Sequence, residues 1–286
     1  MFMKQNKDLS TINCIATSLL AYFFTIPVHE LFHLLTDYAY GDKVICYSAG
    51  AVQPMELIDY MSLPVFDRIM VKGGSASIIN AIIGIILLIV LLKATLKPLT
   101  RVFLTQLMGG HLSVGIGYFM IGGLFGAGDW GNVFSALTDH PETITTLRII
   151  LSFTGCTGIV ALFFILNYMS YYFIKDPDNK KERLHVAFNL HLLMLLIGFP
   201  VGMIVTLLSP ANKTGELSLF LGLFYNMMWI PFFWGFMFTG VMKTLPPKKS
   251  RFLYEIPKKP NYYLFALGII LILIDIFILG PGIYLN

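Results

Sequence analysis

The stretch SASIINAIIGIILLIVLLK, residues 75–93, contains no charged side chain before its last residue. A helix needs about 20 apolar residues to cross the hydrocarbon core of a bilayer, so this stretch predicts a membrane-spanning helix. The same criterion finds six more stretches, at 11–36, 102–126, 148–174, 185–208, 217–242 and 261–281. The sequence therefore predicts an all-α polytopic membrane protein with about seven transmembrane helices.

The overall composition favours the same class of protein. Of the 286 residues, 56% are hydrophobic and 13% are charged, and the mean hydropathy is +0.74, whereas soluble domains average about 45–50% apolar and about 25% charged residues. The loops are too short for an inserted soluble domain, so residues 1–286 are expected to form a single membrane domain. Three cysteines are too few for a disulfide framework.

The net charge of +4 is interpreted as a topology signal in the lipid bilayer and not as affinity for nucleic acid. Fifteen of the twenty Lys and Arg residues fall in the N-terminus and in the loops after the second, fourth and sixth predicted spans. Because cytoplasmic loops carry an excess of Lys and Arg, the N-terminus is expected in the cytoplasm and the C-terminus outside.

The segment IPVHELFHLLTDYAY, residues 26–40, places His29, Glu30 and His33 directly after an uncharged run. A spacing of four puts both imidazoles on one helix face, and the HExxH pattern uses two His as zinc ligands and Glu as general base. Each ionisable group at membrane depth costs about 2.5–3.5 kcal/mol, which favours a compensating metal. The alternative is that Pro27 ends the first span and the histidines lie in hydrated interfacial turns.

A catalytic zinc needs a third protein ligand, for which the best candidate is Asp129 in GGLFGAGDWGN, residues 122–132. The first and third predicted spans run in the same direction, so His33 and Asp129 are expected at the same membrane face. By contrast, His111 precedes Asp129 by eighteen residues, about 27 Å along a helix, which is too far to join the same zinc. The alternative is an ordinary loop aspartate.

A third group of small and polar residues lies at the start of the second span, in KGGSASIINAIIG, residues 72–84. This group is expected at the same membrane face as His33 and Asp129. Its small residues allow close helix packing. We expect Ser77 or Asn80 to hydrogen-bond a substrate backbone, and Asn132 or Asn80 to stabilise an oxyanion; ordinary helix packing is the alternative for Asn80.

The segment GDKVICYSAGAV, residues 41–52, is rich in β-branched and aromatic residues and predicts a short strand or β-hairpin between the first two spans. The edge of such a hairpin could pair with an extended substrate by β-augmentation. The alternative is a plain surface loop.

The order of these features resembles the site-2 protease family of intramembrane zinc metalloproteases. In that family the first core helix carries HExxH, the second begins with a Gly-x-x-x-Asn-like motif, and the third supplies an aspartate, usually within Leu-Asp-Gly. This chain has HExxH in full and a looser match at Gly73 and Ser77, while Asp129 follows Gly128 and precedes Trp130. The resemblance covers a metalloprotease-like core of three spans, residues 11–135; residues 136–286 add a four-span helical region.

The resemblance implies one Zn²⁺ held by His29, His33 and Asp129, with Glu30 as the catalytic base. The implied reaction is hydrolysis of a peptide bond in a membrane-embedded or membrane-proximal protein. Family members also have a re-entrant hairpin after the first span, and they usually place the site toward the cytosol, whereas the charge count here places it near the outer face.

Three other functions compete with the protease. A metal-ion transporter could use His29 and His33, but it would need ionisable groups through the bundle, and the later spans offer little beyond His191 and Asp275. A diiron membrane oxygenase would need more clustered histidines than this chain has. A catalytically inactive, protease-like binding protein is the third alternative.

Overall fold

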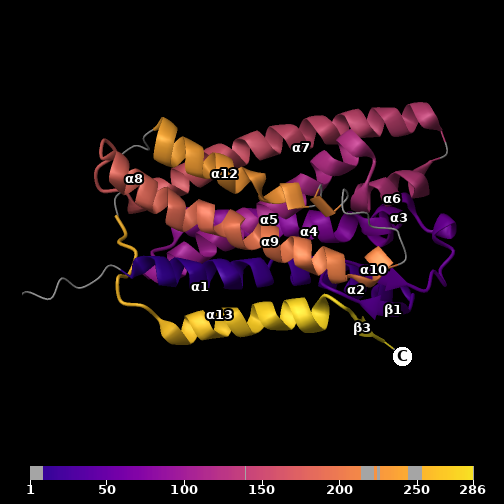
Figure 1. Ribbon diagram of the computed structural model, residues 1–286. Helices are drawn as coiled ribbons and strands as arrows, with labels where there is room; N and C mark the ends of the chain where they lie inside the picture. The colour runs from indigo at the N-terminus through magenta and orange to yellow at the C-terminus, as the bar shows by residue number, and fades with distance from the viewer. Residues whose placement is uncertain (1–8, 139, 214–221, 224–225, 244–252, 286) are drawn as a thin grey trace, which may run out of the picture.

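The computed structural model describes residues 9–138, 140–213, 222–223, 226–243 and 253–285, which form an elongated bundle of helices with a small sheet at one end (Figure 1). Six helices in these ranges are long and apolar enough to cross a membrane: Ser10–Tyr40, Val65–Lys93, Pro98–Phe125, Pro141–Tyr171, Lys180–Leu208 and Tyr262–Leu279. The prediction of a helical polytopic membrane protein is thereby confirmed.

The predicted span 217–242 falls partly outside the described residues. Its described part contains a shorter apolar helix, Met227–Met242, which is made of η5 (Met227–Trp229), α12 (Ile230–Phe236) and η6 (Met237–Met242).

The first three spans contain α1 (Ser10–Phe23), α2 (Ile26–Tyr40), α3 (Val65–Ile69), η2 (Met70–Gly74), α4 (Ser75–Lys93) and α5 (Pro98–Phe125), and between α2 and α3 lies the short turn η1 (Tyr60–Ser62). The short α6 (Gly128–Leu137) follows α5. The remaining elements are α7 (Pro141–Ser170), η3 (Tyr171–Phe173), α8 (Lys180–Ala187), η4 (Phe188–Leu192), α9 (Leu193–Leu208), α10 (Pro210–Lys213), α13 (Tyr262–Ile274) and η7 (Asp275–Leu279).

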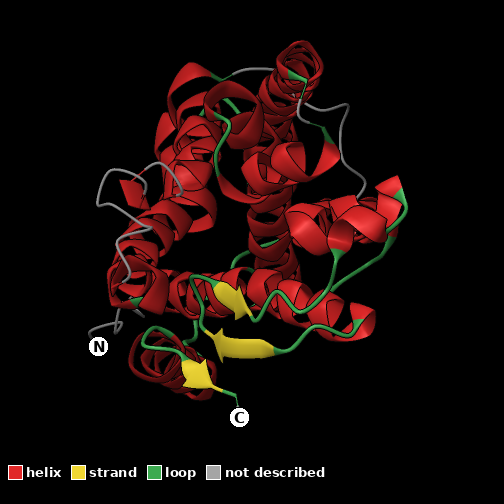
Figure 2. Cartoon of the chain, turned by 90° about the vertical axis from the view of Figure 1, so that its right-hand side faces the viewer, coloured by secondary structure: helices red, strands yellow, loops and turns green. Residues whose placement is uncertain are grey.

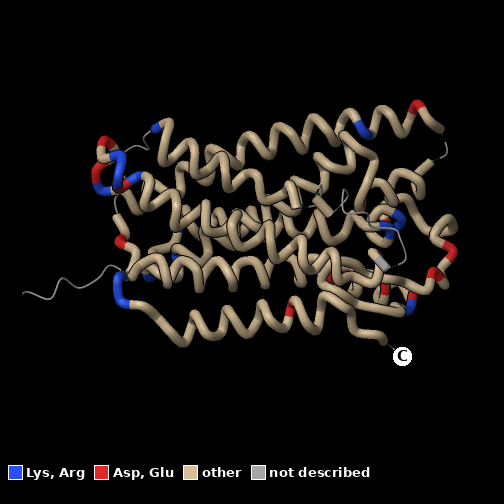
Figure 3. The backbone as a smooth tube through the Cα atoms, viewed as in Figure 1, with Lys and Arg blue, Asp and Glu red and all other residues tan. Residues whose placement is uncertain are grey.

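The outer surface of the bundle is apolar along its length. Large side chains stay exposed on α4, α7 and η7, among them Ile85, Phe153 and Phe277. Most charged positions of the described chain gather at the two ends of the bundle (Figure 3). A bilayer would cover such a surface, because hydrocarbon surrounds the middle of a spanning helix and water meets its ends.

The core forms around α5, which packs against α1, α4 and α7. Its main cluster joins Met108 and Leu112 of α5 to Leu166 of α7 and to Trp229 and Phe232 of the later helices. Since α13 also packs on α1, the spans of residues 136–286 share one core with the first three.

The first span is broken between α1 and α2, where the sequence predicted one helix over 11–36. Helix α1 ends at Phe23 and α2 begins at Ile26, with Pro27 in its first turn. Proline suits this position because its missing N–H would have no intrahelical acceptor there. His29 and His33 therefore lie on a separate helix that continues the first span.

The predicted hairpin is present at the end of the bundle that holds α2 and α6. Strands β1 (Val44–Tyr47) and β2 (Val52–Pro54) pair antiparallel. A third strand, β3 (Ile283–Tyr284), pairs antiparallel with the other side of β1, so the order is β2-β1-β3 (Figure 2). Within the described residues, β2 therefore keeps one edge without a partner strand.

Candidate metal centre

Helix α2 directs two imidazoles to one place. His29 and His33 lie one turn apart with ring centroids 5.0 Å from each other, as their spacing of four predicts. His29 is 1% exposed, and its ring stacks on Tyr118 of α5 with a centroid distance of 4.7 Å. These contacts hold the His29 ring before any ligand binds.

The turn between α5 and α6 directs Asp129 toward the same place. Gly126 and Gly128 adopt φ values of +63° and +67°, a left-handed conformation that favours glycine. Arg148 of α7 donates to the last carbonyls of α5, with Nε 3.1 Å from Gly123 O and Nη2 2.8 Å from Leu124 O. The helix breaks in this glycine-rich segment, between the end of α5 at Phe125 and the start of α6 at Gly128, and the chain turns sharply just before the carboxylate.

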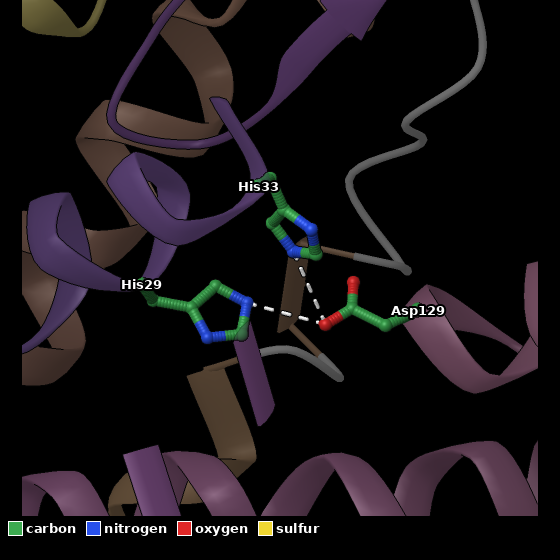
Figure 4. Close-up of side chains that lie close together, drawn as sticks. All are labelled: His29, His33 and Asp129. Atoms are coloured by element: carbon green, nitrogen blue, oxygen red, sulfur yellow. Dashed lines mark ion pairs between the residues drawn. The ribbon is translucent and has the colours of Figure 1, made fainter. Parts of the chain in front are cut away.

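The three side chains meet as Figure 4 shows. Oδ2 of Asp129 lies 3.2 Å from Nε2 of His29 and 3.3 Å from Nε2 of His33. One candidate ligand atom from each of the three residues lies within 4.8 Å of the others, and in the described parts of the chain this is the one group of its kind. The structure therefore brings together the three residues that the sequence proposed as ligands.

The chemistry of this group suits a divalent metal. Nε2 of His29 and Oδ2 of Asp129 are both buried and form no hydrogen bond within the described chain, although they lie 3.2 Å apart. Buried polar atoms without partners are rare in native proteins and call for an explanation. Two imidazole nitrogens and one carboxylate oxygen form the type of ligand set that zinc uses in catalytic sites.

The electrostatic surroundings keep the Asp129 carboxyl ionised. Burial alone raises its pKa, but the facing His33 and His29 lower the pKa to well below its usual range. A metal ligand must be deprotonated, so this carboxylate is in the required state.

Asn80 of α4 links the His29 ring to a further histidine. Its Nδ2 lies 3.0 Å from Nδ1 of His29 and donates to Ala76 O at 2.8 Å, and its Oδ1 lies 2.6 Å from Nδ1 of His111. All three side chains are at most 3% exposed. His111 is thus outside the ligand group but connected to it through one amide.

The amide of Asn80 also sets the tautomer of His29. An amide nitrogen only donates, so Nδ1 of His29 accepts here and the proton of the neutral ring sits on Nε2. A metal on Nε2 requires the proton on Nδ1 instead. A rotation of the Asn80 side-chain amide would present Oδ1 to His29, and it would break the bond from Nδ2 to Ala76 O.

The residues that the sequence proposed for substrate binding, Ser77, Asn80 and Asn132, differ in whether they reach the cavity. Ser77 is fully buried; its Oγ accepts from Nε1 of Trp130 at 2.9 Å and donates to Gly74 O at 3.2 Å. As placed, Ser77 and Asn80 therefore bond to protein groups and lie off the described cavity wall, and Ser77 ties α6 to α4. Asn132, by contrast, lines the cavity beside Asp129.

A cavity of about 990 Å³ opens onto the group. Glu30, His33 and Asp129 lie on its wall, together with residues 52–54 of strand β2. The Glu30 side chain is 6% exposed. The Glu of the HExxH motif, two of the candidate ligands and the strand with the unpaired sheet edge thus line one cavity.

Tyr47 fastens the hairpin to α2. Its hydroxyl donates to Pro27 O at 2.8 Å. Burial raises the pKa of Tyr47, with smaller contributions from the charges of Glu30 and Asp275, so the phenol stays protonated and able to donate. The bond keeps the central strand of the sheet beside the first turn of α2, close to His29 and Glu30.

Fold and site together define a helical membrane protein with a His-His-Asp candidate metal centre at one end of the bundle. Comparison with protein-family models, with curated proteins and with solved structures gives no match.

Proposed function

We propose that this chain is an intramembrane zinc metalloprotease of the site-2 protease type, which hydrolyses a peptide bond in a membrane-embedded or membrane-proximal protein. The observation that carries this proposal is the meeting of His29, His33 and Asp129 beside a cavity that His33, Asp129 and Glu30 line. Glu30 favours a hydrolase over a site that only binds metal, because hydrolysis needs a general base beside the metal ligands to activate water.

The residues of the chain have distinct roles in this proposal. His29, His33 and Asp129 hold the metal, and a bound Zn²⁺ would polarise the scissile carbonyl and lower the pKa of water toward about 7. The Glu30 carboxylate takes a proton from the attacking water and returns it to the leaving amine. Asn132 lies on the same wall, and in this proposal its amide donates to the oxygen of the substrate carbonyl.

Strand β2 gives the substrate a place to lie. A peptide bond in a helix is shielded by its own hydrogen bonds, so the substrate must be extended before it is cut. Residues 52–54 present a strand edge on the cavity wall, and such an edge binds an extended peptide through main-chain hydrogen bonds. Because β3 occupies the other edge of β1, the sheet offers its partner-free edge on the side of the metal centre.

The proposed topology has seven crossings, with Met227–Met242 in the sixth. The described chain begins at one end of the bundle and finishes at the opposite end (Figure 1), which supports an odd number of crossings. The Lys and Arg distribution supports a cytoplasmic N-terminus, and the metal centre would then lie near the outer face.

Metal analysis of the purified full-length protein tests the proposal. We expect about one zinc per chain in the wild type, little in Asp129→Ala, and hydrolysis of synthetic peptides that depends on the bound zinc. Iron in place of zinc, or an equal zinc content in both proteins, would contradict the assignment. Several bound ions, or metal flux into vesicles, would favour the transporter instead.

A further inference from the structure

Asp37 lies on the cavity wall one turn of α2 beyond His33. Its side chain belongs to a residue only 5% exposed. Within the described chain its carboxylate accepts no hydrogen bond and forms no ion pair. A carboxylate in a largely buried residue gains from a partner of opposite charge, so this position favours a cationic ligand that enters the cavity.

None of the described charged side chains near Asp37 forms an ion pair with it. Oδ1 of Asp42 accepts from the backbone N–H groups of Lys43 and Leu57, at 2.8 and 3.0 Å. Lys72 is the one Lys or Arg on the described part of the cavity wall. Its Nζ pairs with Glu56 at 3.4 Å and stands 3.5 Å from the Tyr60 ring centroid. Among the described residues, Asp37 and the proposed base Glu30 are therefore the acids of this wall with neither an ion pair nor a side-chain hydrogen bond.

We propose that Asp37 receives a Lys or Arg side chain of the peptide substrate, about two residues from the scissile bond. The inference rests on the proposed protease function and names a feature of its substrate. Four residues of helix separate Asp37 from His33, which corresponds to about 6 Å along α2. An extended peptide advances about 3.3 Å per residue. A charge-assisted hydrogen bond to a buried carboxylate is among the stronger polar contacts in proteins.

Peptide binding to an inactive protein tests this inference without requiring cleavage. The probe is a set of fluorescein-labelled dodecapeptides of Ala, Val and Gln with a single Lys at each position in turn, alongside matched peptides with Gln at that position. Binding is measured by anisotropy to the zinc-loaded full chain carrying Glu30→Gln. We expect the best Lys peptide to bind about tenfold more tightly than its Gln match. Adding Asp37→Asn should remove the preference, and Asp37→Lys should transfer it to peptides with Glu.

The matched control is Asp59→Asn. Asp59 is an exposed acid at the same end of the bundle, outside the cavity wall, so this variant should keep the Lys preference. A preference that survives Asp37→Asn would overturn the inference, as would its absence in the parent protein. If Asp37→Asn is not recovered folded, Asp37→Glu takes its place and should retain the preference, since the charge is kept.

Two further outcomes separate this inference from the proposed function. Cleavage of peptides by the wild type without any Lys preference would overturn the inference and leave the protease intact. A Lys preference that depends on Asp37, in a wild-type protein that does not cleave, would uphold the cationic subsite and refute the protease. A second metal equivalent that is lost in Asp37→Asn would overturn the inference, because Asp37 would then be a metal ligand.

Discussion

Gly73 and Asp129 lie in direct backbone contact. Gly73 belongs to η2 and has a φ of +127°, and a Cβ at this position would lie 2.8 Å from both Cα and Cβ of Asp129. Real Cβ atoms do not approach backbone so closely. The position of Asp129 therefore requires a residue without a side chain, Gly73, at the start of the second span.

Gly73→Ala should displace Asp129 and weaken zinc binding by at least about tenfold, since two ligands hold the metal less tightly than three. The measurement is zinc affinity by competition with a chromogenic chelator. Gly41→Ala is the matched control: Gly41 also has a positive φ, +89°, but nothing lies within 4 Å of its added Cβ. That variant should keep its zinc affinity even if it is less stable. Equal affinities in both variants would contradict the prediction.

Asn80→Leu should lower zinc affinity by about 10–100-fold, the usual effect of removing a partner that orients a ligating histidine. The change removes the amide between His29 and His111 while it keeps a similar volume. The control is Asn189→Leu, because Asn189 is equally buried but its side-chain amide bonds to the ring and the backbone carbonyl of His185. Its zinc affinity should equal that of the wild type. If both variants lose zinc to the same extent, Asn80 has only a general role in packing.

Glu30→Gln should retain one zinc and lose at least about a hundredfold in peptide hydrolysis, the scale on which general bases contribute. His29→Ala should lose the metal itself. Both results come from metal analysis combined with mass spectrometry of a peptide mixture after incubation. Full hydrolysis by Glu30→Gln would refute the role assigned to Glu30.

Trp130→Phe should weaken zinc binding about fivefold, because it removes the bond from Nε1 to Ser77 that ties α6 to α4. A neutral buried hydrogen bond contributes about 1 kcal/mol, which corresponds to about that factor. Trp234→Phe serves as the control, since Trp234 is 37% exposed on α12. A larger loss in Trp234→Phe than in Trp130→Phe would contradict the assignment.

Deletion of residues 282–286 should expose Cys46 to thiol reagents. Cys46 lies in β1, is 1% exposed, and an added Cβ on Gly282 would collide with its Sγ. The experiment uses a Cys156→Ser background, because Cys156 is exposed, and follows maleimide labelling over time. Equal labelling with and without the deletion would show that β3 does not cover this side of the sheet.

The sequence predicts the parts of this structure that depend on local periodicity. Uninterrupted apolar runs mark the spans, a spacing of four places His29 and His33 on one face, and β-branched residues mark the hairpin. Because successive spans alternate in direction, the first and third spans end at the same side of the membrane, and this predicts that Asp129 lies at the same end of the bundle as His33. The spans and the positions of these side chains follow from helix geometry and bilayer thickness, which apply equally to every membrane-spanning segment.

The contacts that complete the site carry no such pattern. A buried Asn80 looks the same in sequence whether it bonds a histidine or a neighbouring backbone, and Trp130 resembles any interfacial aromatic residue. The two residues of β3 follow a Gly-Pro-Gly turn, too short a stretch for a strand signal. Their partners are set by tertiary packing across more than one helix, which periodicity does not report.

Strand β3 comes after every other described helix and strand in the order of synthesis, yet it pairs with β1, which is among the first elements made. A nascent chain therefore carries a hairpin that is open on both sides while the helices insert. Until β3 has been synthesised, the β1 edge that it will occupy is free to pair with other extended chains. Chaperones that act during membrane insertion should therefore bind the nascent chain at this edge.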